Sequence, residues 1–343
     1  MHIKKLLCAI LTIYSFSIFA QETEDSESES VDLAQNFLAK SATAVEAVAW
    51  TRDGKYFATS WNNSVILWDA ATNAIAAVYS NAVDETSNPL ANVISLHFSD
   101  DGLYLLSVRD DNTVLIHSIG GNGDSTLIRG TGTQMSEAVY TGGSYRMVFP
   151  LDGMNLYESF KLMATGEYII EEKVAMTEQP CALSTTPNGR KLLVTSKRGT
   201  VSLIDTESWE TEMTFSKFVQ TGVKPRFAPD SVHYVAAENQ STLLVASISD
   251  ESDFYTIEDQ IGFCHAAEFS NDSTKIAAAL NSGCVKLYDI ASGLEETQFQ
   301  LLYGDTAKSL VFSPDDLYVI IGTEKGYIYR WVLSGGEFIP DYS

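Results

Sequence analysis

Beyond about residue 36 the chain alternates between short apolar segments and clusters rich in Asp, Asn and Gly. The apolar segments contain many β-branched and aromatic residues, a composition typical of β-strands. Pairs such as Asp-Gly, Asp-Asp and Asn-Gly separate the segments and favour tight turns. The pattern predicts an all-β domain built from many short strands.

One pattern, an aromatic or polar anchor followed by a turn and an apolar strand, recurs along this region. The five clear copies are WTRDGKYFAT from Trp50, FSDDGLYLLS from Phe98, FAPDSVHYVA from Phe227, FSNDSTKIAA from Phe269 and FSPDDLYVII from Phe312. Two weaker copies are YTGGSYRMVF from Tyr140 and TTPNGRKLLV from Thr185. The seven anchors are 42 to 48 residues apart.

A second element follows the anchor at a fixed distance in five copies. It reads NSVILWD, NTVLIHS, GTVSLID, GCVKLYD and GYIYRWV, and its aromatic or equivalent residue lies 18 or 19 positions after the anchor. Four short strands fit within a repeat of about 42 residues, which is the period of a propeller blade. The sequence therefore predicts a seven-bladed β-propeller of four-stranded antiparallel blades, each packed between two neighbours.

The repeat resembles that of the WD40 family over about residues 36–340. The matching residues are Phe269-Ser270-Asn271-Asp272, Phe312-Ser313-Pro314-Asp315 and Trp68-Asp69, with Ile204-Asp205 and Tyr288-Asp289 as weakened copies. The family's Gly-His pair before the first strand is absent, because Ser41 stands before Val45 and Gln260 before Cys264. The His–Ser–Asp–Trp hydrogen-bond network is therefore not expected, and TolB-type and YVTN-type propellers remain alternatives.

The first 35 residues are predicted to lie outside the domain. Residues 1–20 resemble a secretory signal peptide, because two lysines precede a 15-residue apolar run from Leu6 to Ala20. An uncleaved membrane anchor is the alternative, although a spanning helix needs about 20 apolar residues. Residues 21–35 form an acidic linker that we expect to be disordered, with six acids and no base in 21–32. The mature protein is therefore expected to be secreted or periplasmic, with no membrane span.

The charge balance excludes one class of partner. The chain has 22 basic and 45 acidic residues, a formal net charge of −23. Nucleic-acid binding needs clustered Lys and Arg, so we do not expect nucleic acid as a partner. The same balance disfavours docking on an anionic lipid surface.

The residues that could carry chemistry do not form a pattern typical of catalysis. Four histidines follow the leader, on predicted first, second and third strands, with no pair at metal-ligand spacing: His97, His117, His233 and His265. Three pairs of acids fall in predicted turns: Asp100-Asp101, Asp110-Asp111 and Asp315-Asp316. Turn formation is the main interpretation of these pairs, and weak Ca²⁺ binding is the alternative. We expect no metal, no cofactor and no catalytic residue.

Three cysteines remain after the leader: Cys181, Cys264 and Cys284. Cys264 and Cys284 are expected on the first and third strands of one blade, about 9–10 Å apart, which is too far for a disulfide. We therefore predict free thiols.

The favoured function is a protein-interaction scaffold without catalysis, acting as a monomer with a protein partner. The alternative is an enzyme or small-ligand-binding propeller that uses the central channel, of a lactonase-like or quinone-binding type. Such a channel needs metal-ligating acids and histidines or a ring of stacked Trp residues, and the five Trp residues show no periodic placement.

The candidate interaction face carries the turns between second and third strands and the connections between blades. The candidate residues on it are Trp61, Arg109, Leu151, Lys197, Arg198, Glu238, Asn281 and Lys325. Four cations among them stand out against the acidic background, and an exposed Trp beside Arg is typical of an interface hot spot. The alternative for Trp61 is that it folds back over the neighbouring strands. The longest connection, 81–92, is expected to reach the same face.

Two segments could supply the outer strand that closes the ring. Leu38 lies 12 residues before Trp50, as outer-strand residues do in other copies, which favours residues 36–39. The alternative is the C-terminal tail around Phe338, with a short helix over residues 33–38.

Overall fold

The computed structural model describes residues 37–61, 64–79, 91–120, 125–131, 137–141, 145–162, 167–215, 219, 223–239, 242–250, 252–258, 263–302 and 304–333. The expected signal peptide and linker therefore lie outside the described residues, as do most of the connection 81–92 and Phe338. In the described ranges no helix is long and apolar enough to cross a membrane.

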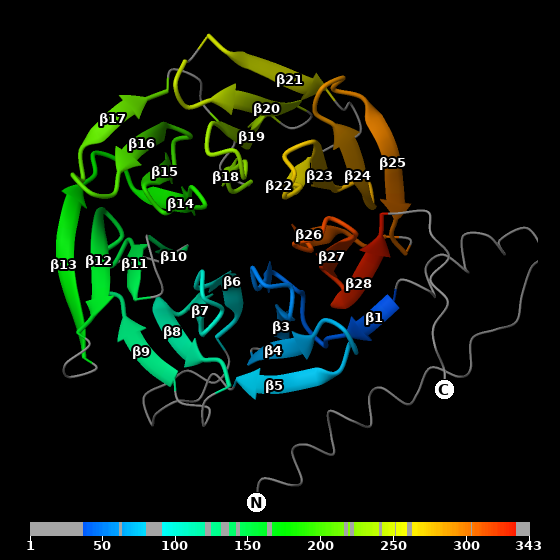
Figure 1. Ribbon diagram of the computed structural model, residues 1–343, viewed down its shortest axis with the longest axis horizontal. Coiled ribbons are helices and arrows are strands. Elements are labelled where there is room, and N and C mark those ends of the chain that lie inside the picture. Colours follow the sequence, from blue (N-terminus) through cyan, green and yellow to red (C-terminus); the bar gives the residue numbers. More distant parts are fainter. Residues whose placement is uncertain are drawn as a thin grey trace, which may run out of the picture.

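The described chain forms seven four-stranded antiparallel sheets arranged as blades around a central axis (Figure 1). Blades I to III contain, from the axis outward, β2 (Val48–Trp50), β3 (Tyr56–Trp61), β4 (Ser64–Asp69) and β5 (Ile75–Tyr79); β6 (Val93–Phe98), β7 (Tyr104–Arg109), β8 (Thr113–Ser118) and β9 (Ser125–Arg129); and β10 (Val139–Tyr140), β11 (Arg146–Phe149), β12 (Asn155–Lys161) and β13 (Tyr168–Ala175). The predicted all-β propeller is confirmed.

The remaining blades follow the same order. Blades IV to VI contain β14 (Pro180–Thr185), β15 (Lys191–Ser196), β16 (Val201–Asp205) and β17 (Thr211–Thr214); β18 (Arg226–Phe227), β19 (His233–Asn239), β20 (Thr242–Ser247) and β21 (Phe254–Glu258); and β22 (Cys264–Phe269), β23 (Lys275–Leu280), β24 (Cys284–Asp289) and β25 (Glu295–Gln300). Blade VII contains β26 (Ala307–Phe312), β27 (Tyr318–Thr323), β28 (Tyr327–Val332) and, as its outer strand, β1 (Phe37–Lys40).

The ring is closed by the beginning of the described chain. β1 pairs antiparallel with β28, with Phe37 opposite Tyr329 and Lys40 opposite Tyr327 (Figure 1). The Phe37 ring contacts the edges of Tyr327 and Tyr329, with centroids 6.2 and 6.3 Å apart. The predicted N-terminal closure is confirmed, with the strand running one residue further than expected, to Lys40.

The hydrophobic core consists of layers between adjacent blades. One layer joins blades VII and I, where Ile320 and Ile328 pack in the same cluster as Val45, Phe57 and Trp68. Another joins blades V and VI through residues such as Val235 and Ile276. Because each layer is made by two blades, no blade buries its faces alone.

Hydroxyl groups organise the turns that follow the anchors. The Ser99 hydroxyl donates to the Asp101 carboxylate at 2.7 Å and accepts from the Tyr104 amide at 2.9 Å. The same hydroxyl-to-side-chain bond recurs from Ser313 to Asp315, at 2.6 Å. These acids therefore satisfy turn backbone and side-chain donors, as the turn interpretation predicts.

One part of the hydrogen-bond network that the sequence did not predict is present in blade I. The Trp68 indole N–H donates to the Thr59 hydroxyl at 3.0 Å, between the third and second strands. The bond fixes the indole against its own blade and satisfies a buried donor.

Truncation tests the role of β1. A mature chain that begins at Val31 keeps β1 and is expected to match the stability of the full mature protein. A chain that begins at Ser41 lacks β1. It exposes the edge of β28 and loses the packing of the buried Ala39, so its free energy of unfolding should fall by several kcal/mol. Urea unfolding measures both, and equal stability of the two truncated chains would contradict the role of β1.

Candidate functional site

The described second-to-third-strand turns lie beside the described residues of the connections between blades, on one face that we term the connector face. Backbone hydrogen bonds join them, from the Gly130 amide to Asn112, from the Val219 amide to Gly199 and from the Leu301 amide to Gly283, at 2.8 to 2.9 Å. The predicted sharing of one face is therefore present at these three turns, each of which is held by a neighbouring connection.

The candidate residues of this face differ widely in exposure. Lys197, Arg198, Asn281 and Lys325 are exposed, while Trp61, Leu151 and Glu238 are partly buried. The Arg198 side chain is 82% exposed and lies 3.6 Å from the Glu178 carboxylate, a residue of the connection between blades III and IV. The exposed members thus come from the turns of blades IV, VI and VII.

Arg109 is an exception among the candidate residues. It is the last residue of β7, it is completely buried, and its guanidinium lies 3.5 Å from the Asp111 carboxylate. Burial lowers the pKa of Arg109, and the neighbouring Asp111 opposes this shift. Arg109 therefore stabilises its own turn and presents no charge to a partner, which corrects its expected place on the surface.

Trp61 also lies in a strand rather than in a turn. It ends β3, and its ring meets the edge of Trp68 at a centroid distance of 6.0 Å. Trp61 packs against the core layer between blades VII and I. The alternative predicted for Trp61, packing over the adjacent strands, is therefore present, and its side chain is partly buried.

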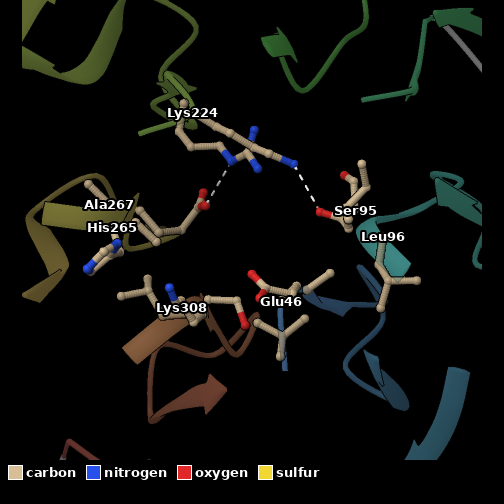
Figure 2. Close-up of a pocket in the computed structure, with 15 residues that line it drawn as sticks. Glu46, Ser95, Leu96, Lys224, His265, Ala267 and Lys308 are labelled. Carbon is tan, nitrogen blue, oxygen red and sulfur yellow. Dashed lines mark hydrogen bonds and ion pairs between the residues drawn. The ribbon is translucent and has the colours of Figure 1, made fainter. Parts of the chain in front are cut away.

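A second feature lies at the axis, where a cavity of about 280 Å³ is lined by residues from five blades. Its walls carry five charged side chains and one imidazole: Glu46, Lys224, Arg226, Glu268, Lys308 and His265. In Figure 2, Lys224 and Glu46 point into the cavity from opposite sides. Most of these residues lie on or directly before inner strands, because those strands alone reach the axis.

A buried carboxylate beside this cavity binds two of the cations. Glu137 is 2% exposed, and its Oε1 lies 3.3 Å from Lys224 Nζ and 3.3 Å from the Arg226 guanidinium. Its Oε2 accepts a hydrogen bond from the Leu183 amide at 2.9 Å. Burial alone would raise the pKa of Glu137, but these cations and the amide hold it below its ordinary value. Glu137 is therefore charged and fixes both cations.

Glu268 is the second carboxylate of this cluster. Its Oε2 lies 3.4 Å from Arg226 Nε, across the boundary between blades V and VI. Burial raises the pKa of Glu268 to about 7, Glu137 adds to the rise, and Arg226 opposes it. Glu268 is therefore the group of this cluster that changes charge near neutral pH.

The sequence analysis missed this cluster because its members are far apart in the chain. Glu137 and Arg226 are 89 residues apart, so no local motif joins them. Aligning the repeats gives the signal: Glu137 and Lys224 each lie three residues before an anchor, and Arg226 and Glu268 each lie one residue before an anchor. Equivalent positions of different blades converge at the axis of a propeller.

The histidines and cysteines have structural surroundings. His117 is completely buried between the hydroxyls of Ser107 and Ser125, at 2.8 and 2.7 Å, and burial lowers its pKa to about 3. Cys181, Cys264 and Cys284 form no disulfide in the structure. The described residues contain no group of three or more His, Cys, Asp or Glu placed to hold a metal ion.

The raised pKa of Glu268 predicts how stability depends on pH. The folded protein keeps a proton on Glu268 that the unfolded chain releases above the ordinary value of 4.5, so this stabilisation is lost as pH rises from there to about 7. Replacing Glu268 with Gln removes this dependence. Relative to the wild type, Glu268→Gln should gain about 2 kcal/mol in free energy of unfolding between pH 5 and pH 8.

Urea unfolding at the two pH values measures this difference. Glu207→Gln removes an exposed acid from the turn after β16 and serves as the matched control, with no expected change in the difference. A Glu268→Gln protein whose stability relative to wild type is the same at both pH values would contradict the assignment.

Comparison with known proteins shows a family similarity in two parts of the chain. The family model described as WD domain, G-beta repeat matches residues 34–69 and 86–118. The first range includes β1 and the first three strands of blade I, and the second includes the first three strands of blade II. Among curated proteins the search finds no significant match. The structure is a β-propeller of seven four-stranded blades, and its first two repeats are similar to the WD40 family.

Proposed function

We propose that this protein is a secreted or periplasmic protein-interaction scaffold, without catalysis, that binds its partner on the connector face as a monomer. The WD40-like propeller suggests an interaction scaffold. The observation that carries the choice of face is the exposed basic pair Lys197 and Arg198 on a chain whose net charge is −23.

The connector face suits recognition because its backbone is held in place. Gly199 follows the basic pair with a φ of 86°, and its carbonyl accepts the Val219 amide at 2.9 Å. A side chain at position 199 would meet the Val219 carbonyl oxygen at 2.3 Å, so only glycine fits this close approach. A rigid turn loses little conformational entropy on binding.

The charge of the face favours a partner with an acidic patch. Arg198 has one carboxylate neighbour, Glu178, whose oxygens also accept hydrogen bonds from Ser196 and Thr200. Lys325 adds an exposed cation in blade VII, beside the exposed carboxylate of Glu324. Asn281 adds an exposed amide from blade VI, and the partly buried Trp61 supplies some aromatic surface in blade I. Exposed charges of this kind steer association and select between partners.

The cavity at the axis supports a second candidate function, the binding of a small molecule. It is surrounded by residues on or near inner strands and is lined by charged groups of both signs. The two functions use different residues and are compatible in one molecule.

Reversing the charge of one arginine at each end of β15 tests whether the partner binds on the connector face. Arg198 follows β15 on the connector face, and Arg190 precedes β15 on the opposite face; both are exposed. Once a partner has been captured with the mature protein and purified, Arg198→Glu should weaken its binding about tenfold, mostly through slower association. Arg190→Glu, the matched control, should leave the dissociation constant within about twofold.

Surface plasmon resonance at two salt concentrations measures both variants. The effect of Arg198→Glu should shrink at high salt, because exposed charges are screened. A purified partner whose binding falls with Arg190→Glu and not with Arg198→Glu would place the interface on the opposite face.

A further inference from the structure

The cavity at the axis presents opposite charges on facing walls. Lys224, which lies two residues before the inner strand of blade V, reaches across the cavity and donates to the Ile94 carbonyl at 3.3 Å (Figure 2). Glu46, which precedes the inner strand of blade I, enters from the opposite side (Figure 2). The cavity therefore has a cationic pole and an anionic pole.

The cationic pole consists of groups that are fixed but not fully enclosed. Glu137 holds both Lys224 and Arg226, and Glu268 adds a second carboxylate contact to Arg226. The Lys224 side chain is 32% exposed, which leaves its ammonium group accessible from the cavity. Lys308 lies on the other side of the cavity, the side of Glu46 (Figure 2), and pairs there with the largely exposed Glu324 carboxylate, 3.8 Å away.

The anionic pole is Glu46. Its side chain is exposed, and it has no hydrogen-bond or ion-pair partner among the residues that the structure describes. Glu46 acts on Lys224 only through the electrostatic field across the cavity. A carboxylate in this position is free to accept hydrogen bonds from a bound cationic group.

The balance of charge at the cavity favours a neutral ligand with two charged ends. Three cations, Lys224, Arg226 and Lys308, and three carboxylates, Glu46, Glu137 and Glu268, line or adjoin the cavity, so groups of the two signs are equal in number. A simple anion would also have to approach a chain with a net charge of −23. A zwitterion avoids this repulsion and meets both poles.

We propose that the cavity binds a small zwitterion of the amino-acid class, with its carboxylate at Lys224 and its ammonium group at Glu46. A volume of about 280 Å³ is below that of most drug-sized sites, which suits a single amino acid rather than a peptide. This site is independent of partner binding on the connector face.

Isothermal titration calorimetry with L-alanine tests the proposal on the full mature protein. L-alanine should give saturable binding, and acetate and methylammonium, which each carry one of its charges, should bind at least about tenfold more weakly. Glu46→Gln should weaken L-alanine binding at least about tenfold, and the matched control Glu207→Gln should change it by less than about twofold.

Thermal melts establish that both variants are folded, which is expected because Glu46 and Glu207 are exposed. Three results would each overturn the proposal. The first is the absence of L-alanine binding up to about 10 mM. The second is acetate or methylammonium binding as tightly as L-alanine, which would indicate a site for a plain anion or cation. The third is L-alanine binding that Glu46→Gln leaves unchanged.

Discussion

The structure depends on closing a ring whose blades cannot bury their faces alone. Each core layer is shared by two blades, as where Ile320 and Ile328 of blade VII pack with Val45 and Phe57 of blade I. An open ring would expose two apolar faces and leave the edge of β28 unpaired. The pairing of β1 with β28 joins the two ends of the described chain in one blade. The stability of every layer is thereby coupled to a strand that lies outside the repeats.

Closure also positions the two candidate sites. Seven inner strands converge on the axis, so residues from distant repeats, such as Glu137 and Arg226, become neighbours there. Their charges are far enough from bulk water for burial to raise the pKa of Glu268 to about 7. On the connector face the same ring holds the turns against the connections, which presents Lys197 and Arg198 on a fixed backbone. One architecture thus supports a rigid surface and a charged cavity.

Most of the fold could be predicted from the sequence because the signals for strands, turns and repeats come from residues that are close together in the chain. The spacing of Leu38 from Trp50 even indicated the closing strand. The placement of single side chains was less predictable. Arg109 and Trp61 were assigned to turns, whereas each ends a strand, and a shift of one residue decides whether a side chain faces solvent or the core. The charged cluster at the axis involves residues from different blades, so it becomes visible only when the repeats are superimposed.

Hydrogen–deuterium exchange of the mature protein tests the closure most directly. If β1 closes the ring, the amides of Phe37–Lys40 should be protected, and β28 should exchange as slowly as β24, the equivalent third strand of blade VI. In a chain that begins at Ser41, exchange in β28 should become faster. Rapid exchange of Phe37–Lys40 in the mature protein, with β28 still protected, would show that another segment closes the ring and would contradict this account.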